Sequence, residues 1–338
     1  ALEDKHLKDG FARRIFESNK AEYSRSVIIG AIKQKPYLIK EIFNIFDRKF
    51  NPIYKKRNLK NIDVALENYK KSVQIEFADD ETSANVFLFM TNIITLTVRT
   101  NFYKVKKRAF AFRFSSDILN PIIFPQRVEG IFFVLGFYAI TSYMRASQIA
   151  RGGIRLLRIT RRNYEFELDH MLLLNYALGP VAQRLKHKDI AESGAKSVIA
   201  PYPDYAGDGL NAVFDFIDGI LDLVLPSDEI CDFYGRFLEM VFFGPDEGTA
   251  PFMDVIAQYA REKGYKYWRT ITTGKSTGIP HDAYGLTVDK KIFGLFSEKN
   301  GTRFFLEGGK ELITEDTNQI YRVIGKKIYT SGMTTTGI

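Results

Sequence analysis

The sequence predicts an α/β protein with a mainly helical region at its start and a β-rich segment at its end. Apolar residues recur at helical spacing over residues 26–46. From Val73 onward the chain contains runs of Val, Ile, Phe and Tyr that are typical of strands, and after Val288 short apolar and charged runs alternate as they do in β-hairpins. We therefore expect three regions: residues 1–72, 73–287 and 288–338.

The central region supplies the expected strands. Residues 73–77 and 86–98 are rich in β-branched and aromatic side chains, which favour extended structure. Residues 108–114 (RAFAFRF) place phenylalanines on one side and alanines with Arg113 on the other, which indicates a half-buried strand. Residues 130–145 contain two adjacent apolar runs and predict two further strands.

Helices are expected between and after these strands. Residues 168–188 have a helical pattern, with Pro180 tolerated in the first turn of its second part. Residues 211–225 carry an apolar stripe wide enough for a core helix. Residues 237–243 are a buried-strand candidate, and the polar sequence GPDEGTAP follows them directly.

Composition limits the class of protein. With 338 residues and 45% apolar content, the chain can form a substantial core and is long enough for two folding units. The single cysteine excludes an intrachain disulfide, and the four histidines lack zinc-ligand spacing, so we expect no metal. Without a long apolar run or a secretory signal, the expectation is a soluble protein of the cytoplasm, with the mitochondrion as the alternative.

The net charge of +8 could indicate nucleic acid, an acidic membrane or an anionic small molecule as partner. Much of the charge lies in residues 48–60 and 104–108, where a solvated surface is the simplest interpretation. A nucleic-acid-binding module would require salt-sensitive retention on DNA or RNA. We expect neither nucleic acid nor membrane as partner.

Two segments place cations among glycines and apolar residues. In ARGGIR (150–155), Gly152 and Gly153 permit either close backbone approach to a ligand or a plain tight turn, and Arg151 and Arg155 flank them. In QRLKHKDIAESGAK (183–196), basic residues precede a Gly-Ala-Lys turn and an apolar strand. Several cations directed at one small volume would suit a dicarboxylate.

An acidic pair follows the strand candidate 237–243. In open α/β sheets, ligands bind beyond the carboxyl ends of strands, which is where Asp246 and Glu247 are expected. Pro251 then opens a helix that Gly264 ends. The alternative for Asp246 is a helix-start residue stabilised by the helix dipole.

These segments together resemble the large NAD-dependent glutamate dehydrogenases, particularly their eukaryotic branch. The matching landmarks appear in the family's order: RTNFY with RAFAFRF (99–114), ARGGIR (150–155), QRLKHKDIAESGAK (183–196), GPDEGTAP (244–251) and TTGKSTGIPHDAYGLT (272–287). The resemblance implies an amino-acid-dehydrogenase-like substrate domain with a mixed open sheet flanked by helices. It also implies NAD-dependent oxidative deamination of L-glutamate to 2-oxoglutarate and ammonia, in amino-acid catabolism, by a homo-oligomer.

The family continues into a Rossmann NAD domain, whose GxGxxG motif is missing from this sequence. We therefore expect a fragment that supplies the glutamate-binding and catalytic half, with residues 288–331 as an insert. NAD is expected as cofactor from the resemblance alone. Thr287 is a candidate cofactor contact.

The resemblance also implies roles for individual residues. Arg151 would bind the distal carboxylate beside the backbone of Gly152 and Gly153, Gln183 and Lys186 would bind the α-carboxylate, and Lys196 and Asp246 would be catalytic. Two separated cationic sites fix both ends of glutamate, which is catalysis by positioning. Crowded by other cations, Lys196 should give up its proton readily and activate water, while Asp246 would shuttle protons to and from the amine.

One departure from the family pattern concerns the lysine. The family often has Gly-Gly-Ala-Lys-Gly-Gly, whereas this chain has Ser-Gly-Ala-Lys-Ser-Val at 193–198, which reduces backbone freedom around Lys196. The alternative function is therefore a catalytically silent homologue with a regulatory or assembly role. It predicts no glutamate-dependent NADH formation by the full-length protein.

Overall fold

The computed structural model describes residues 5–146, 150–182, 193–235, 239–246, 248–272, 304–306 and 310–312. The chain forms two compact units. Unit 1 comprises Ala1–Val105, Phe112–Arg127 and Ser227–Gly235, and unit 2 comprises Lys106–Ala111, Val128–Pro226 and Arg236–Ile338. Each unit is therefore assembled from segments that are distant in the sequence.

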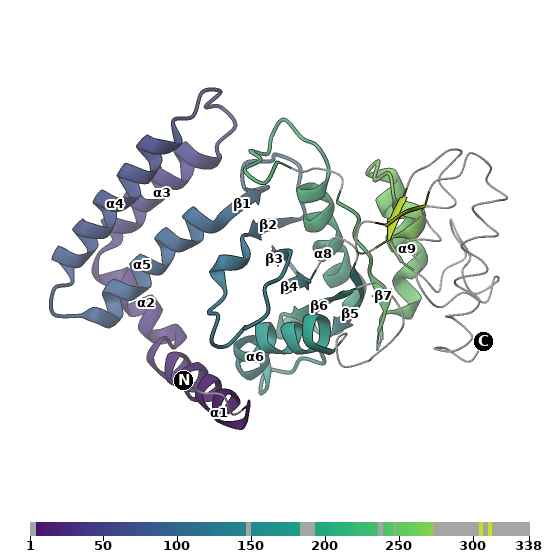
Figure 1. Ribbon diagram of the computed structural model, residues 1–338, viewed down its shortest axis with the longest axis horizontal. Coiled ribbons are helices and arrows are strands. Elements are labelled where there is room, and N and C mark those ends of the chain that lie inside the picture. Colours follow the sequence, from purple (N-terminus) through teal and green to yellow (C-terminus); the bar gives the residue numbers. More distant parts are fainter. Residues whose placement is uncertain are drawn as a thin grey trace. The chain divides into compact units, whose positions relative to one another are not determined.

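Unit 1 is mainly helical. Its helices are α1 (Lys5–Glu22), α2 (Arg25–Gln34), α3 (Pro36–Phe50), α4 (Leu59–Glu76) and α5 (Glu81–Leu96). Helices α3 and α4 lie side by side (Figure 1), and fully buried Leu38 and Tyr69 join one apolar core with Phe87 of α5. Asp80 caps α5 by accepting a hydrogen bond from the backbone N–H of Ser83 at 2.9 Å.

The strands expected at 73–77 and 86–98 were wrong, because both segments are helical. In α4 the buried residues Ile62, Leu66, Tyr69 and Val73 are three or four positions apart, which is helical periodicity. In α5 the β-branched and aromatic content suggested extended structure, but packing of one helix face overrides that preference. Only the last residues of that run are extended, in strand β1 (Thr97–Thr100).

Strand β1 pairs antiparallel with β2 (Ala109–Phe114), which confirms the strand expected from RAFAFRF. The paired residues Arg99 and Arg113 are both fully buried. The Arg99 Nε donates to Asp232 Oδ1 at 2.6 Å, and the Arg113 guanidinium lies 3.4 Å from the centre of the Tyr234 ring. These contacts join the segment Ser227–Gly235 to unit 1.

The sheet is mixed and open, with strand order β1-β2-β3-β4-β6-β5-β7. The remaining strands are β3 (Gly130–Gly136), β4 (Ala139–Arg145), β5 (Ala150–Leu156), β6 (Ser193–Pro201) and β7 (Gly244–Pro245). Antiparallel pairs join β3 to β4 and β4 to β6, whereas β5 runs parallel to both β6 and β7. The expected mixed α/β sheet is thus confirmed, and the two strands expected within 130–145 are β3 and β4.

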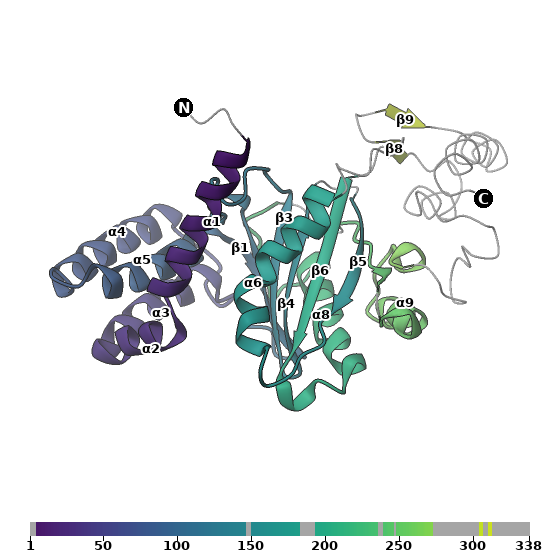
Figure 2. The same ribbon diagram turned by 90° about the horizontal axis from the view of Figure 1, so that it is seen from below.

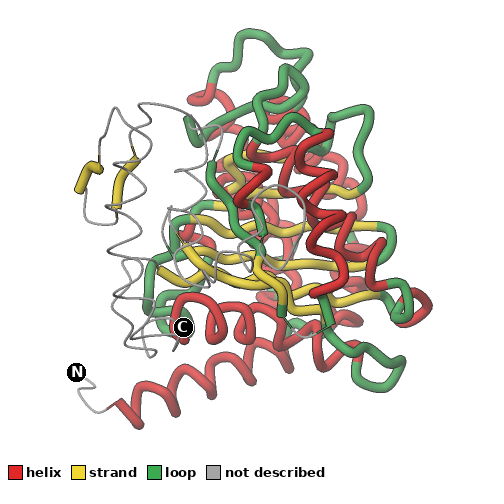
Figure 3. The backbone as a smooth tube through the Cα atoms, turned by 90° about the vertical axis from the view of Figure 1, so that its right-hand side faces the viewer, coloured by secondary structure: helices red, strands yellow, loops and turns green. Residues whose placement is uncertain are grey.

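Helices cover the two faces of this sheet (Figures 2 and 3). Met171 of α6 (Tyr164–Tyr176) packs with Val198 and Ala200 of β6 on one face. On the other face, α8 (Gly209–Val224) contributes to the main core together with Ala195 and Ile199 of β6. The expected core helix 211–225 is confirmed as α8, and most of its residues are buried on all sides.

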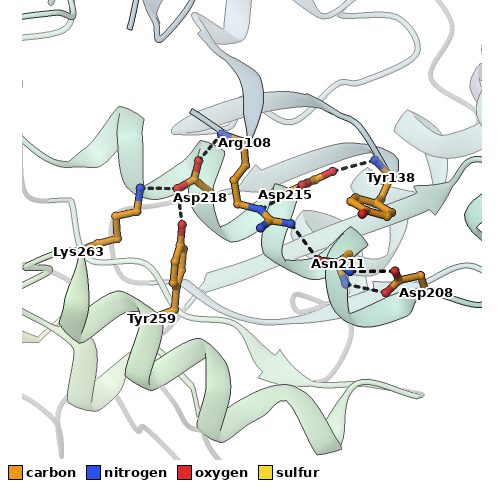
Figure 4. A network of polar contacts seen from close by, with 8 residues as sticks. All are labelled: Arg108, Tyr138, Asp208, Asn211, Asp215, Asp218, Tyr259 and Lys263. Carbon is orange, nitrogen blue, oxygen red and sulfur yellow. Dashed lines mark hydrogen bonds and ion pairs between the residues drawn. The ribbon is translucent and has the colours of Figure 1, made fainter. Parts of the chain in front are cut away.

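Helix α8 carries buried carboxylates that connect several segments of unit 2 (Figure 4). Asp218 accepts hydrogen bonds from the Arg108 backbone N–H at 2.9 Å and the Tyr259 hydroxyl at 2.6 Å, and it pairs with Lys263 at 2.5 Å. Asp215 accepts from the Tyr138 backbone N–H at 2.8 Å. Burial raises the pKa of Asp215, although the hydrogen bond from Tyr138 and the nearby Arg108 guanidinium oppose the rise.

The segment after α8 differs from the sequence expectation. Residues 239–243 are buried for the most part but do not form a strand, because β7 is only Gly244–Pro245; residues 237–238 lie outside the described chain. The expected helix after Pro251 is confirmed as α9 (Met253–Glu262), preceded by a 3₁₀ turn, Ala250–Phe252. Gly264 ends it with a φ of +77°.

Within the expected β-rich segment, the described residues form two paired antiparallel strands, β8 (Phe304–Leu306) and β9 (Lys310–Leu312). The other residues of 288–338 lie outside the described part. No helix in the described parts of the chain is both long and apolar enough to cross a membrane.

Candidate active site

Lys196 lies inside strand β6 and not in a turn, which corrects the sequence expectation. Its partner is Met144 on the β4 side and Gly153 on the β5 side. The apolar residues that follow Lys196 extend the strand to Pro201, so the backbone at the lysine is fixed by hydrogen-bonded neighbours on both sides. Its side chain lies on the sheet face covered by α6, since it shares that face with Val198.

The Gly-Gly pair is part of β5 and not a turn, so the tight-turn alternative was wrong. A Cβ atom on Gly152 would lie 1.8 Å from the carbonyl oxygen of Ala195, which no side chain tolerates. A Cβ atom on Gly153 would lie 3.4 Å from Lys196 Nζ and 3.5 Å from Asp246 Cβ. Gly152 thus permits the strands to approach closely, and Gly153 allows the Lys196 and Asp246 side chains to lie close to the backbone of β5.

Asp246 follows directly after β7, at the carboxyl end of a strand parallel to β5. Its carboxylate accepts a hydrogen bond from Lys196 Nζ, and Arg155 Nε lies 3.6 Å from the same Oδ2 atom. The Lys196 and Asp246 side chains are 12% and 25% exposed, so the pair is sheltered but reachable. The alternative role of Asp246 as a helix-start residue is not favoured, because its carboxylate pairs with the lysine. The N-terminus of α9 makes no capping hydrogen bond with a side chain.

A widened helical turn lies against the other side of Lys196. Helix α6 continues into a π-helical turn, Ala177–Val181, that contains Pro180. A Cβ atom on Gly179 would lie 3.0 Å from the Lys196 backbone nitrogen and 3.1 Å from Lys196 Cβ, so glycine allows this turn to pack onto the strand. Such turns occur frequently at functional sites. The Gly-Pro pair was its only sequence signal, and a regular helix was expected instead.

Several expected substrate contacts cannot be compared with this geometry. Gln183, Lys186 and Thr287 lie outside the described residues. Arg151 is described by its backbone alone, which pairs with Gly194 in the β5–β6 ladder. The substrate and cofactor roles of these residues stay predictions.

The serine after the lysine fits the strand. Ser197 is fully buried, and its hydroxyl donates to the Gly153 carbonyl at 3.3 Å. Extended backbone is open to every residue type, so the reduced freedom expected from Ser197 and Val198 does not disturb the strand at Lys196. Sequence reasoning also missed Thr249, a fully buried residue whose hydroxyl accepts a hydrogen bond from the Asp246 backbone N–H at 2.9 Å.

An amine and a carboxylate joined by one hydrogen bond can pass a proton between them, and both side chains are partly exposed. Among the residues that the structure describes, no group of His, Cys, Asp and Glu could hold a metal ion. The arrangement therefore offers acid–base chemistry from a sheltered pair of side chains.

Comparison with known proteins identifies the family. Residues 72–320 match the family model described as "Bacterial NAD-glutamate dehydrogenase, catalytic domain". "Glutamate dehydrogenase 2" of Dictyostelium discoideum is 34% identical over 278 residues, which is 80% of this chain and 26% of that protein. The "NAD-specific glutamate dehydrogenase" of Saccharomyces cerevisiae is 31% identical over 274 residues, 74% of this chain and 25% of that protein.

A third relative is the "NAD-specific glutamate dehydrogenase" of Neurospora crassa, which is 36% identical over 200 residues, 56% of this chain and 19% of that protein. The chain thus spans about a fifth to a quarter of the length of these relatives. The matched family model covers most of the chain, including β5, Lys196 and Asp246. The chain belongs to the family of NAD-glutamate dehydrogenase catalytic domains.

Proposed function

We propose that the protein containing this chain oxidatively deaminates L-glutamate to 2-oxoglutarate and ammonia with NAD, and that this chain supplies the glutamate-binding and catalytic half. The observation that carries the proposal is the Lys196–Asp246 pair beside Gly153, in which Lys196 lies within β6 and Asp246 directly follows the carboxyl end of β7. The names of the yeast and Neurospora relatives support NAD as cofactor.

The described residues do not fit a dinucleotide site. A pyrophosphate is held by a glycine-rich turn between a strand and a helix, and the sequence contains no GxGxxG motif. In this proposal the pyrophosphate of NAD is therefore bound outside these residues, and Thr287 stays a candidate contact to the cofactor.

Glutamate would be held at both ends. Arg151 is assigned to the distal carboxylate, and Gln183 with Lys186 to the α-carboxylate. Arg151 lies two positions before Gly153 in β5. A dicarboxylate fixed at two points presents its Cα to the space beside Lys196, which reduces the entropy cost of reaction.

Lys196 and Asp246 would then move protons. In its neutral form the Lys196 amine accepts a proton from the water that attacks the iminium carbon of the oxidised substrate. The Asp246 carboxylate, hydrogen-bonded to the same amine, relays a proton to the departing ammonia. Arg155 Nε lies 3.6 Å from the carboxylate oxygen that Lys196 contacts, so a second cation is adjacent to the pair.

The proposal is tested by NADH formation with the full-length protein. Lys196→Ala should lower kcat by about 100-fold or more, because general acid–base catalysis contributes roughly 10²–10⁴ in rate. The matched control is Lys71→Ala, an exposed lysine of α4 in unit 1, which should leave the rate unchanged. Undiminished turnover in the Lys196 variant, with folding retained in both, would remove Lys196 from the mechanism.

The alternative, a catalytically silent homologue with an assembly or regulatory role, predicts no glutamate-dependent NADH at any pH. The regular strand around Lys196 and its contact with Asp246 argue against it. Assembly into a homo-oligomer stays a prediction, and size measurement of the full-length protein in solution would decide it.

A further inference from the structure

Thr249 closes the turn that carries Asp246. Its backbone N–H donates to the Asp246 carbonyl at 3.1 Å, and Gly248 between them has a φ of +78°. A turn with positive φ at its third position favours glycine, which explains the residue at 248. Thr249 itself is fully buried, in contrast to its exposed neighbours Gly248 and Ala250.

The Thr249 hydroxyl makes contacts in two directions. It accepts the Asp246 backbone N–H at 2.9 Å. It also lies 3.0 Å from the Asp246 carbonyl and 3.3 Å from the Ile154 carbonyl of β5, so its own proton can be donated to either oxygen. The side chain thus lies between the backbone of the turn and the strand that contains Gly153.

This link begins where the sheet ends. Strand β7 stops at Pro245, whose nitrogen carries no hydrogen and cannot continue the hydrogen-bond ladder with β5. Asp246 comes next, beyond the last strand pairing. Lys196, in contrast, has strand partners on both sides. The lysine is fixed by the sheet, whereas the aspartate is held by the turn.

We propose that Thr249 is the positioning residue of the Asp246 carboxylate: its buried hydroxyl ties the Asp246 backbone to β5 and thereby holds the carboxylate within hydrogen-bonding distance of Lys196. The inference rests on the proposed function, in which this pair moves protons. Thr249 contacts neither substrate nor cofactor in this role and acts only through Asp246.

The test compares Thr249→Val, which keeps the shape and removes the hydroxyl, with Thr249→Ser, which keeps the hydroxyl, in the full-length enzyme. We expect the valine variant to lose about 10- to 100-fold in kcat, since a small misplacement of a catalytic group costs up to roughly 10²-fold. Its KM for glutamate should stay within about twofold, and the pH profile of kcat should change. The serine variant should retain the wild-type kcat and profile.

A second measurement separates positioning from simple stabilisation. If Thr249 acts through Asp246, adding Thr249→Val to an Asp246→Asn enzyme should cause no further loss of kcat. Additive losses would overturn the proposal. So would a valine variant with a lower unfolding temperature but wild-type kcat and pH profile. If the valine variant does not fold, Thr249→Ala is compared with Thr249→Ser by the same criteria.

A readout without turnover distinguishes failure of this inference from failure of the proposed function. The rate at which trinitrobenzenesulfonate modifies Lys196, followed by mass spectrometry across pH, reports how strongly a carboxylate stabilises the charged amine. Modification should be faster at a given pH in Thr249→Val than in wild type or Thr249→Ser. Equal rates in all three proteins would overturn the positioning role, whether or not the wild type oxidises glutamate.

Discussion

At the scale of single residues, the buried carboxylates of α8 show how polar contacts offset burial. Burial alone would raise the pKa of Asp218, but hydrogen bonds from Lys263, Tyr259 and the Arg108 backbone outweigh it and hold the pKa below its ordinary value (Figure 4). A carboxylate with a lowered pKa in the folded state stabilises the protein above its unfolded pKa. That contribution is lost as the pH falls through the folded pKa.

Asp218→Asn should therefore destabilise the protein most at neutral pH. We expect a loss of about 2–3 kcal/mol at pH 7, because buried donors lose a charged acceptor. The difference from wild type should shrink as the pH falls below about 4, where the wild-type carboxyl also becomes protonated. Urea unfolding of the wild type and the variant at pH 7 and below about pH 4 measures the difference in their free energies of unfolding. Exposed Asp117→Asn is the matched control, and a pH-independent difference would contradict the assignment.

Sequence reasoning at this scale predicted catalytic roles for Lys196 and Asp246 but not their geometry. Both residues were recognised from motif resemblance, and the structure brings them together across a separation of 50 positions. Thr249 was not identified, because a threonine carries no chemical signal until the turn that buries its hydroxyl is known. The expected glycine-rich turn at Lys196 was wrong, because strand pairing on both sides determines the backbone there.

At the scale of elements, the close approach of β5 to β6 depends on a single glycine. Gly152→Ala should destabilise the protein by more than about 3 kcal/mol, because the added Cβ would lie 1.8 Å from the Ala195 carbonyl oxygen. Gly207→Ala is the control, since that position has no atom within 4 Å of an added Cβ. It should be neutral or slightly stabilising. Thermal unfolding measures both, and similar behaviour of the two variants would contradict this account.

Helices and strands were predicted well where the apolar residues followed either helical spacing or strand alternation clearly. Strands β2, β3 and β4 and helices α8 and α9 all had clear local signals. Helix α5 was missed because its β-branched and aromatic residues favour strands locally, while its burial in the helical core of unit 1 decided the outcome. The π-helical turn Ala177–Val181 was missed because its packing against Lys196 is not visible in a local pattern.

At the scale of the whole molecule, each unit gathers distant segments. The overall α/β class and the helical start were predictable from composition and periodicity. The return of Ser227–Gly235 to unit 1 was not, because it rests on contacts between distant residues, such as the Arg99–Asp232 ion pair across 133 positions. Local sequence carries no information on such a contact.

For the whole protein, ligand binding should reveal a site built for a dicarboxylate. In the full-length protein, 2-oxoglutarate at about 100 times its Kd should stabilise the folded state by ~2.7 kcal/mol and raise the unfolding temperature. At equal concentration 2-oxobutanoate, which lacks the distal carboxylate, should do so much less. Arg151→Gln should reduce the difference between the two acids. Equal shifts with both acids in the wild type would contradict the two-anchor assignment.

The position of Lys196 within a paired strand has a consequence for insertions and deletions. Residues of β6 alternate between the α6 face and the apolar core under α8, so Lys196 and Ala195 point to opposite sides. A shift of one residue in the register of β6 would turn the lysine into that core and place Ala195 or Ser197 on the α6 face in its stead. Insertion or deletion of a single residue within β6 should therefore break the contact between Lys196 and Asp246.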